Sequence, residues 1–301
     1  MSHLLNNITR LERPELALHN DLALDFCLWP SISPQSISAG DSWRSINLLW
    51  HSFEVAGVTA QMMPICEAIR TELGDWKTVW GVKWADGQIS WELYFYDYER
   101  IDRTSSATRL LKVLSKYVDC QVTIDEQSQY FMFSIDVDTQ IITRQRSLDS
   151  INLYIGNVAN HGSMISSGLC YRHTTNSSTL TNLYYFFDVE RGQQDIYDKL
   201  ILSIHTPFGA LPIEQLLMPQ LRNCRTIVVA NKPTNDALYF SGITAKQLSY
   251  FFQRVGLASQ LTDFFDNNRH RFDHLLFDVG ADFTVVDGQL QFTKASYYGV
   301  F

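Results

Sequence analysis

The Asp-Gly dipeptide at residues 86–87 joins two strand-like runs between Trp76 and Tyr98, and it constrains the fold more than any other sequence feature. Asp-Gly is preferred in two-residue type I′ turns, and such a turn fixes the register of a β-hairpin. Residue 84 then faces 89, 82 faces 91 and 80 faces 93. Alternate residues of a strand point to opposite faces, so the register predicts one apolar and one polar face. The apolar face holds Trp80, Val82, Trp84, Ile89, Trp91 and Leu93, and the polar face holds Lys83, Ser90, Glu92, Tyr94 and Tyr96.

A second hairpin near the end of the chain repeats this pattern around Asp287-Gly288. The same turn type pairs residue 285 with 290, 283 with 292 and 282 with 293. Lys294 has the parity of Phe292, so it falls on the apolar face unless the strand contains a bulge. The apolar face is then Phe283, Val285, Leu290 and Phe292, and the polar face is Asp282, Thr284, Gln291, Thr293 and Tyr297.

The rest of the chain alternates between strand and helix patterns. Before residue 76 the apolar spacing is helical, Pro64 is expected to open a helix, and the polar stretch 30–36 is a linker candidate. Further strands are expected near Phe131–Val137, Ile151–Ile155, Gly168–Thr174, Leu183–Val189, Thr226–Ala230 and Ala237–Phe240. Helices are expected near Thr104–Val118, Gln194–Ile204, Glu214–Leu221, Thr244–Val255 and Leu261–Phe272. We therefore divide the chain into a helical N-terminal segment, residues 1–75, packed on a hairpin/helix domain, residues 76–301.

Composition excludes several classes of protein. With 7 Trp, 14 Tyr and 18 Phe, 46% hydrophobic and 19% charged residues, the chain is neither disordered, coiled-coil nor collagen-like. The net charge of −8 is spread without a basic block, which argues against nucleic acid or an anionic membrane as the main partner. The five cysteines are scattered, and the N-terminus lacks a leader pattern. These features predict a cytoplasmic protein.

Successive hairpins imply an antiparallel sheet, and each helix must cover the apolar face of that sheet. The fold class is therefore α+β. Two arrangements remain for the sheet, an open sheet in one or two domains and a barrel jacketed by helices. About ten strands, if closed, would enclose room for a small ligand, because about eight strands are just filled by side chains. Closure would also remove exposed strand edges, so we favour the barrel.

A helix-jacketed barrel of this length, with polar and aromatic residues on its inner face, resembles the aromatic prenyltransferases of the αββα-barrel class. The resemblance covers about residues 76–301 and is architectural, without a diagnostic motif. It implies transfer of an isoprenyl group from an allylic diphosphate to an aromatic or peptide-borne acceptor in the lumen. It implies no cofactor other than magnesium bound with the diphosphate.

The resemblance also implies roles for residues that match by type and strand position. Glu92 would remove the proton from the acceptor. Basic residues would hold the diphosphate, and tyrosines would shield the allylic cation. The basic candidates are Lys83, Arg172, Lys232 and Lys294, and the tyrosine candidates are Tyr94, Tyr184, Tyr239 and Tyr297.

Simpler interpretations stay open beside these. Lys83 and Glu92 could form an ordinary cross-strand charge pair, and tyrosine-rich strands commonly belong to cores. His270 and His274 are spaced i, i+4 without an evident third ligand, so no metal site is predicted. The dinucleotide, P-loop, nucleophile-elbow and zincin motifs are absent from the sequence. The alternative function is a non-catalytic binding or assembly protein, which would meet a protein partner through an aromatic-rich interface.

Overall fold

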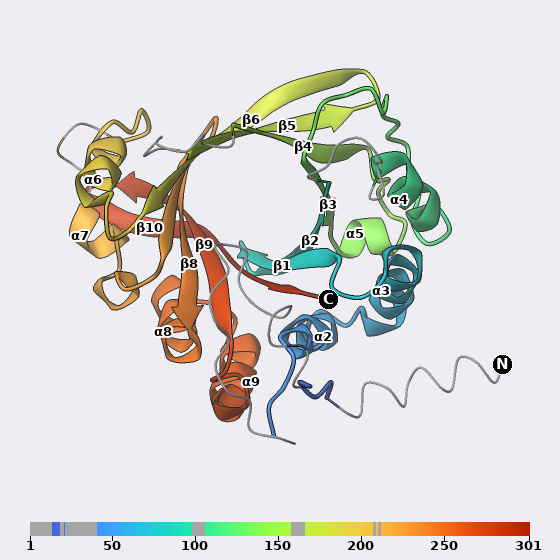
Figure 1. Cartoon of the computed structure of the whole chain (residues 1–301), viewed down its shortest axis with the longest axis horizontal. Helices are drawn as coiled ribbons and strands as arrows, with labels where there is room; N and C mark the ends of the chain where they lie inside the picture. The colour runs from blue at the N-terminus through green and yellow to red at the C-terminus, as the bar shows by residue number, and fades with distance from the viewer. Residues whose placement is uncertain are drawn as a thin grey trace.

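The ten strands of the described residues close into an antiparallel barrel, seen end-on in Figure 1. This computed structural model describes residues 14–18, 21, 41–97, 106–157, 166–206, 209 and 212–301. Strands adjacent in sequence pair with each other, and β1 closes the barrel by pairing with β10. The α+β class and the closed barrel are thus confirmed. The strands are β1 (Thr78–Ala85), β2 (Gln88–Tyr96), β3 (Met132–Val137), β4 (Ser150–Asn157), β5 (Ser166–Thr174), β6 (Ser177–Asp188), β7 (Thr226–Asn231), β8 (Asp236–Thr244), β9 (Leu276–Val286) and β10 (Gln289–Val300).

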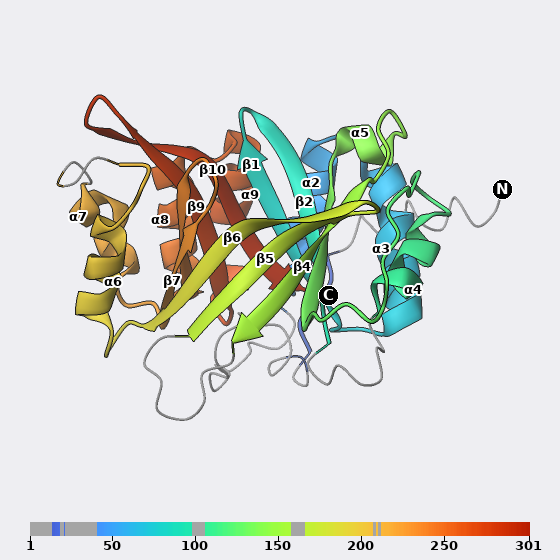
Figure 2. The ribbon, with the colours of Figure 1, turned by 90° about the horizontal axis from the view of Figure 1, so that it is seen from above.

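The helices lie on the outside of the barrel, and the ribbon views show no helix over β5 (Figures 1 and 2). One end of β6 is covered by α6 (Gln193–Ile201), where Lys199 lies 4.3 Å from the centroid of the Tyr185 ring. The apolar stripes of the helices and the outward-facing strand residues form one continuous core. Trp91, for example, packs on Phe53 and donates a hydrogen bond of 2.8 Å from its indole nitrogen to Ser52. The helices are α2 (Ile46–Val55), α3 (Thr59–Leu73), α4 (Ala107–Leu114), α5 (Thr139–Ile142), α6 (Gln193–Ile201), α7 (Ile213–Leu216), α8 (Ala245–Val255) and α9 (Ser259–Asn268), with 3₁₀ turns at Pro219–Leu221 and Arg269–Arg271.

The first hairpin has the register that its turn predicts. Asp86 and Gly87 have φ values of 50° and 75°, as a type I′ turn requires at both central positions. Trp84 faces Ile89, Val82 faces Trp91 and Trp80 faces Leu93. The tryptophans at 80 and 91 are fully buried in the helix-facing core, and the polar face of the hairpin turns toward the barrel interior.

A bulge in β10 changes the predicted register of the second hairpin. The pairs 285–290 and 283–292 are confirmed, but the register shifts between Phe292 and Lys294, so Asp282 faces Lys294 and not residue 293. An extra residue in one strand reverses the facing of everything beyond it. Lys294 therefore points into the lumen. The prediction that Tyr297 lies on the polar face is wrong, because its ring packs outside the barrel against Trp80 and Phe252, with centroids 6.0 and 5.0 Å away.

Several predicted helix boundaries also need correction. Pro64 does not open a helix but lies inside α3, which begins five residues earlier. The segment predicted as one helix over Glu214–Leu221 consists of α7 and a 3₁₀ turn, separated by Met218 in a left-handed conformation. The last predicted helix ends at Asn268, where a 3₁₀ turn follows. The linker candidate at 30–36 lies outside the described residues.

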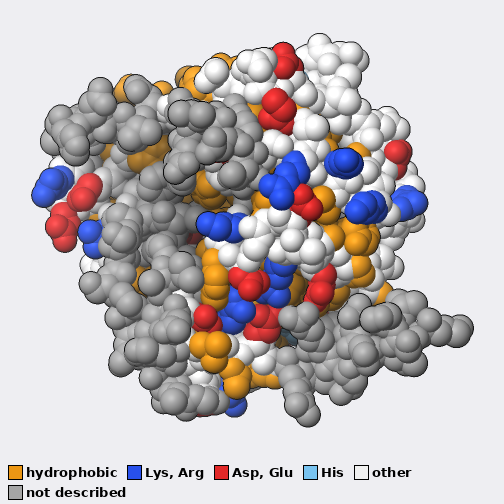
Figure 3. Space-filling view, turned by 45° about the vertical axis from the view of Figure 1, so that its right-hand side comes forward, with side chains coloured by type: hydrophobic (Ala, Val, Ile, Leu, Met, Phe, Trp, Pro, Cys, Tyr) orange, Lys and Arg blue, Asp and Glu red, His pale blue; other side chains and the backbone are white. Residues whose placement is uncertain are grey.

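Two features of the molecular surface bear on partners. Within the described ranges, no helix combines the length and the apolar sequence needed to cross a bilayer. On the face shown in Figure 3, Lys and Arg side chains are intermixed with Asp and Glu.

Candidate active site in the barrel lumen

The barrel encloses a cavity of about 670 Å³, a size typical of small-molecule sites. Its wall is built from the inward-facing residues of the strands, so its chemistry follows from strand parity. The charged residues of this wall are Lys83, Arg172, Lys232 and Lys294 on the basic side and Glu92, Asp136, Asp278 and Asp282 on the acidic side. Among the described residues of the wall, basic and acidic groups are thus equal in number, and their arrangement decides which charge a ligand meets.

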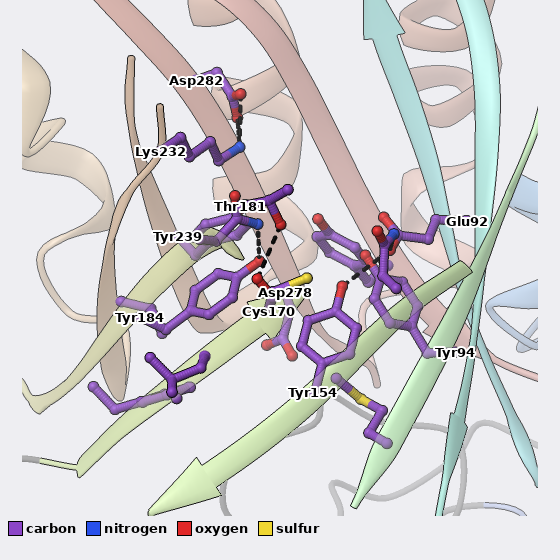
Figure 4. A pocket seen from close by; sticks show the side chains of 18 of the residues that line it. Glu92, Tyr94, Tyr154, Cys170, Thr181, Tyr184, Lys232, Tyr239, Asp278 and Asp282 are labelled. Carbon is purple, nitrogen blue, oxygen red and sulfur yellow. Dashed lines mark hydrogen bonds and ion pairs between the residues drawn. The ribbon is translucent and has the colours of Figure 1, made fainter. Parts of the chain in front are cut away.

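A belt of tyrosines surrounds the middle of the cavity, and Figure 4 shows four of its members. Each comes from a different even-numbered strand, and successive ring centroids around the wall lie 6.0 to 6.3 Å apart. The members are Tyr298 on β10, Tyr94 on β2, Tyr154 on β4, Tyr184 on β6 and Tyr239 on β8. Burial raises the pKa of every one of them, so all carry neutral phenol groups at physiological pH.

Small residues on the odd-numbered strands make room for the belt. A Cβ atom at Gly280 would lie 2.4 Å from the ring of Tyr239, and one at Gly81 would lie 2.7 Å from the ring of Tyr298. Beside Tyr154 and Tyr184 the cross-strand neighbours on β5 are Cys170 and Gly168. The alternation of large and small residues therefore lets the rings lie against the wall and keeps the lumen open.

The first charged cluster joins β1, β2 and β3. Lys83 forms ion pairs with Glu92 and with Asp136, the second at 2.5 Å. Glu92 also accepts hydrogen bonds from Ser134 and, at 3.1 Å, from the hydroxyl of Tyr154. One lysine thus serves two carboxylates, and the cluster carries a formal charge of −1.

Burial alone would raise the pKa of Glu92, but the Lys83 ammonium and the hydrogen bonds from its neighbours outweigh burial and lower it well below its usual range. Burial likewise opposes the charge on Lys83, yet Asp136 and Glu92 raise the Lys83 pKa well above its usual value. Both groups are therefore ionised across the physiological range.

The second charged cluster joins the β7–β8 connection to β9 and β10. Lys232 contacts both carboxylate oxygens of Asp282, at 2.8 and 2.7 Å, and Lys294 contacts the second of them at 3.1 Å. Here two lysines share one carboxylate, which gives a formal charge of +1. Burial and the neighbouring Lys232 lower the pKa of Lys294 to about 8. Burial would raise the pKa of Asp282, but the two lysines lower it.

Arg172 lies at the mouth of the cavity and differs from the lysines in its exposure. Its side chain is 55% exposed, with Asp149 at 3.6 Å and a 3.1 Å hydrogen bond from Nε to Ser150. It also lines a second, smaller cavity of about 260 Å³ that shares Asp136 and Asn152 with the lumen.

Of the candidates named from the sequence, all except Tyr297 line this one cavity. Sequence reasoning placed Asp282 on the polar face without giving it a role, and it missed Tyr154, Tyr298 and Asp278. Tyr154 could have been predicted, because it lies two residues after Asn152 in an expected strand. Alternate residues of a strand share one face, and in this strand that face lines the lumen. Tyr298 could not have been predicted, because the bulge in β10 has no glycine or other signal in the sequence.

Comparison with solved structures agrees with this architecture. AnaPT from Neosartorya fischeri, an aromatic prenyltransferase with a barrel fold, matches over 84% of this chain and 91% of its own, with a TM-score of 0.52. The two chains share a fold. Their sequences are 11% identical, so the likeness shows the fold alone. No protein-family model and no curated protein matches the sequence.

Proposed function

We propose that this chain transfers an isoprenyl group from an allylic diphosphate to an aromatic acceptor inside the barrel. The observation that carries the proposal is the order of groups along one lumen. The cluster of +1 charge at Lys232 and Lys294 is followed by the tyrosine belt, and Glu92 reaches the belt through its hydrogen bond with Tyr154.

Each part of this order suits one part of the reaction. The ester C–O bond of the substrate breaks, and its electron pair leaves with the diphosphate, whose charge the two lysines would balance. The electron-rich faces of the tyrosines would stabilise the allylic cation by about 0.5–2 kcal/mol each. The acceptor carbon then bonds to the allylic carbon, and the proton displaced from the ring passes to Glu92. The low pKa of Glu92 suits this role, because a protonated aromatic ring is a strong acid.

Lys83 and Arg172 stay predicted diphosphate ligands, but we expect each to contribute less to diphosphate binding than Lys232 and Lys294. The charge of Lys83 is already shared by Glu92 and Asp136, and the guanidinium of Arg172 is half in solvent. Within the described part of the chain, no three His, Cys, Asp or Glu side chains gather as metal ligands. Magnesium would therefore enter with the diphosphate as its counter-ion.

The alternative of an aromatic partner interface has less support. Tyr197 is the one strongly exposed large aromatic side chain among the described residues, and the other strongly exposed apolar residues are aliphatic. We therefore assign the aromatic surplus of the sequence to the core and to the belt, and do not propose the interface as a second function.

The direct test is to incubate the native protein with dimethylallyl, geranyl and farnesyl diphosphate in the presence of indole, a phenol or a tyrosine- or tryptophan-containing peptide. We expect release of diphosphate and a product whose mass is increased by the isoprenyl group. The matched control is the Lys232→Met/Lys294→Met double variant, which should bind none of the three diphosphates in a calorimetric titration. Failure of the native protein to bind any of them would overturn the proposal.

A further inference from the structure

Lys294 is the more weakly held of the two lysines that share Asp282. Three donors converge on one carboxylate oxygen, Oδ2: the ammonium of Lys232 at 2.7 Å, that of Lys294 at 3.1 Å and the Asn235 amide at 3.2 Å. A carboxylate oxygen has about two lone pairs, so the three donors compete for them. Lys232 has a second contact, to Oδ1 at 2.8 Å (Figure 4). The charge of Lys294 is therefore the less well compensated of the two.

The amine of Lys294 is also more accessible than those of Lys83 and Lys232. Its side chain is 31% exposed, against 14% and 9% for the other two, and it lines the cavity because the bulge after Phe292 turns it inward. Charged groups act on it from three neighbouring elements: Lys232 on the β7–β8 connection, Asp282 on β9 and Lys83 on β1. A small molecule in the lumen can therefore reach its nitrogen.

The surroundings of Lys294 favour a neutral amine. Burial and the neighbouring Lys232 lower its pKa to about 8, so about a tenth of this side chain is neutral at pH 7. A desolvated lysine beside a second cation is the form that attacks carbonyl carbon atoms. Lys83 differs, because Asp136 and Glu92 outweigh the effect of burial and raise its pKa well above the usual value. Lys294 is therefore the better nucleophile of the two.

Aromatic rings lie one step from this amine along β10. Ser296 and Tyr298 follow Lys294 on the same face, and alternate residues of a strand are roughly 6.6 Å apart. The ring of Tyr239 and the hydroxyl of Ser296 meet at Gly280, where a Cβ atom would lie 2.4 and 2.9 Å from them. The tyrosine belt therefore begins next to Lys294. An aromatic ring packed on the belt can present a carbonyl group to the nitrogen.

We propose that Lys294 binds an aromatic aldehyde covalently, as an imine at Nζ, with the ring of the aldehyde held against the tyrosine belt. The neutral nitrogen attacks the carbonyl carbon, and the π electron pair of the C=O bond moves to the oxygen. The C–O bond of the resulting carbinolamine then breaks, and the oxygen leaves as water with the two protons of the amine. When the imine takes up a proton, Asp282 is its counter-ion. The step needs no oxidant or reductant and does not depend on the proposed isoprenyl transfer.

The test is reductive trapping on the native full-length chain, with 2-naphthaldehyde and sodium cyanoborohydride at neutral pH, followed by peptide mapping by mass spectrometry. Cyanoborohydride reduces the imine to a stable secondary amine, so the map identifies the lysine that reacted. We expect Lys294 to be labelled roughly tenfold faster, or more, than the exposed Lys246 on α8. The competitor 2-methylnaphthalene has the same ring and no carbonyl group. It should slow the labelling of Lys294 and leave that of Lys246 unchanged.

Two variants serve as a matched pair. Lys294→Arg keeps the positive charge but has no amine to form an imine, so the lumen label should be lost, whereas Lys246→Arg should retain it. The map of the native chain identifies the labelled residue even if Lys294→Arg does not fold. Equal labelling of Lys294 and Lys246, a label on Lys232 in place of Lys294, or labelling of Lys294 that 2-methylnaphthalene does not slow would overturn the inference. A selective label on Lys294 in a chain that releases no diphosphate would refute the proposed transfer and support this site.

Discussion

The two charged clusters of the lumen use the same residue types in opposite proportions. Around Lys83, one lysine meets the two carboxylates of Glu92 and Asp136, whereas around Asp282 two lysines meet one carboxylate. The first cluster has an excess of negative charge and the second an excess of positive charge. The difference teaches that counting basic residues does not locate an anion site in this barrel. Under the proposed function, the local charge balance favours proton removal at the first cluster and anion binding at the second.

The substitution Glu92→Gln is expected to have the largest effect on activity, and it tests the role of the first cluster. The variant retains the size of the side chain but cannot take a proton, so turnover should fall by roughly 10²–10⁴-fold, as for loss of a general base. Binding of the allylic diphosphate should stay within a few-fold of the native value. Single-turnover kinetics and a calorimetric titration measure the two quantities separately. If Asp136→Asn, at the half-exposed carboxylate of the same cluster, lowered turnover as much, Glu92 would have no special role.

Stability should distinguish the clusters next. Lys83→Met leaves the buried Glu92 carboxylate without its lysine, and loss of one partner from a buried pair costs about 3–5 kcal/mol. Lys232→Met leaves Lys294 to neutralise Asp282, so its loss in the free energy of unfolding should be clearly smaller. Urea denaturation at neutral pH measures both. Equal losses would show that the second lysine does not substitute for the first.

Diphosphate affinity should show the reverse order. Lys232→Met removes half of the positive charge of its cluster, and loss of a charge-assisted hydrogen bond, about 1.5–3 kcal/mol, should weaken binding by roughly 10–150-fold. Lys246→Met, at an exposed position on α8, is the matched control and should bind like the native chain. A greater loss of affinity in Lys83→Met than in Lys232→Met would place the diphosphate at the other cluster.

The smallest effect expected is a pH dependence of diphosphate binding. Because the pKa of Lys294 is lowered to about 8, this lysine is charged below pH 8 and neutral above it. Raising the pH from 7 to 9 therefore removes one positive charge, and affinity should fall by roughly tenfold, as for one charge-assisted contact. Lys294→Arg keeps its charge over this range, so its affinity should stay level. A native affinity that does not change between pH 7 and pH 9 would contradict the assignment.

The local part of the fold could be predicted from the sequence because turn chemistry is local. Asp86-Gly87 fixed the first hairpin, and its register placed Lys83 and Glu92 on the face that lines the lumen. Closure of β1 on β10 is a contact between residues more than 200 positions apart. No turn encodes such a contact, so the barrel could be favoured over an open sheet only by the argument from exposed edges.

The candidate site was predictable up to the point where strand parity is interrupted. The bulge after Phe292 sent Lys294 inward and Tyr297 outward, and nothing in the local sequence marks it. The belt has a clearer signature, since tyrosines on even strands face small residues such as Gly280 on odd strands. This pattern can be recognised only when the strand pairs are known, because the tyrosine and the small residue that faces it are distant in sequence.

The neighbouring residues Tyr297 and Tyr298 have a consequence for how this chain can change in length. One ring packs in the core and the other lines the lumen, and beside them Ala295 and Ser296 divide the same two faces. A deletion or insertion of one residue between Lys294 and Ala295, beyond the bulge, would exchange the members of each pair. Both faces would still receive a tyrosine and a small side chain. Gly299 limits this exchange, because a Cβ atom at its position would lie 2.3 Å from the ring of Trp80. The length of the strand that closes the barrel is therefore set by this glycine, one residue beyond the tyrosine pair.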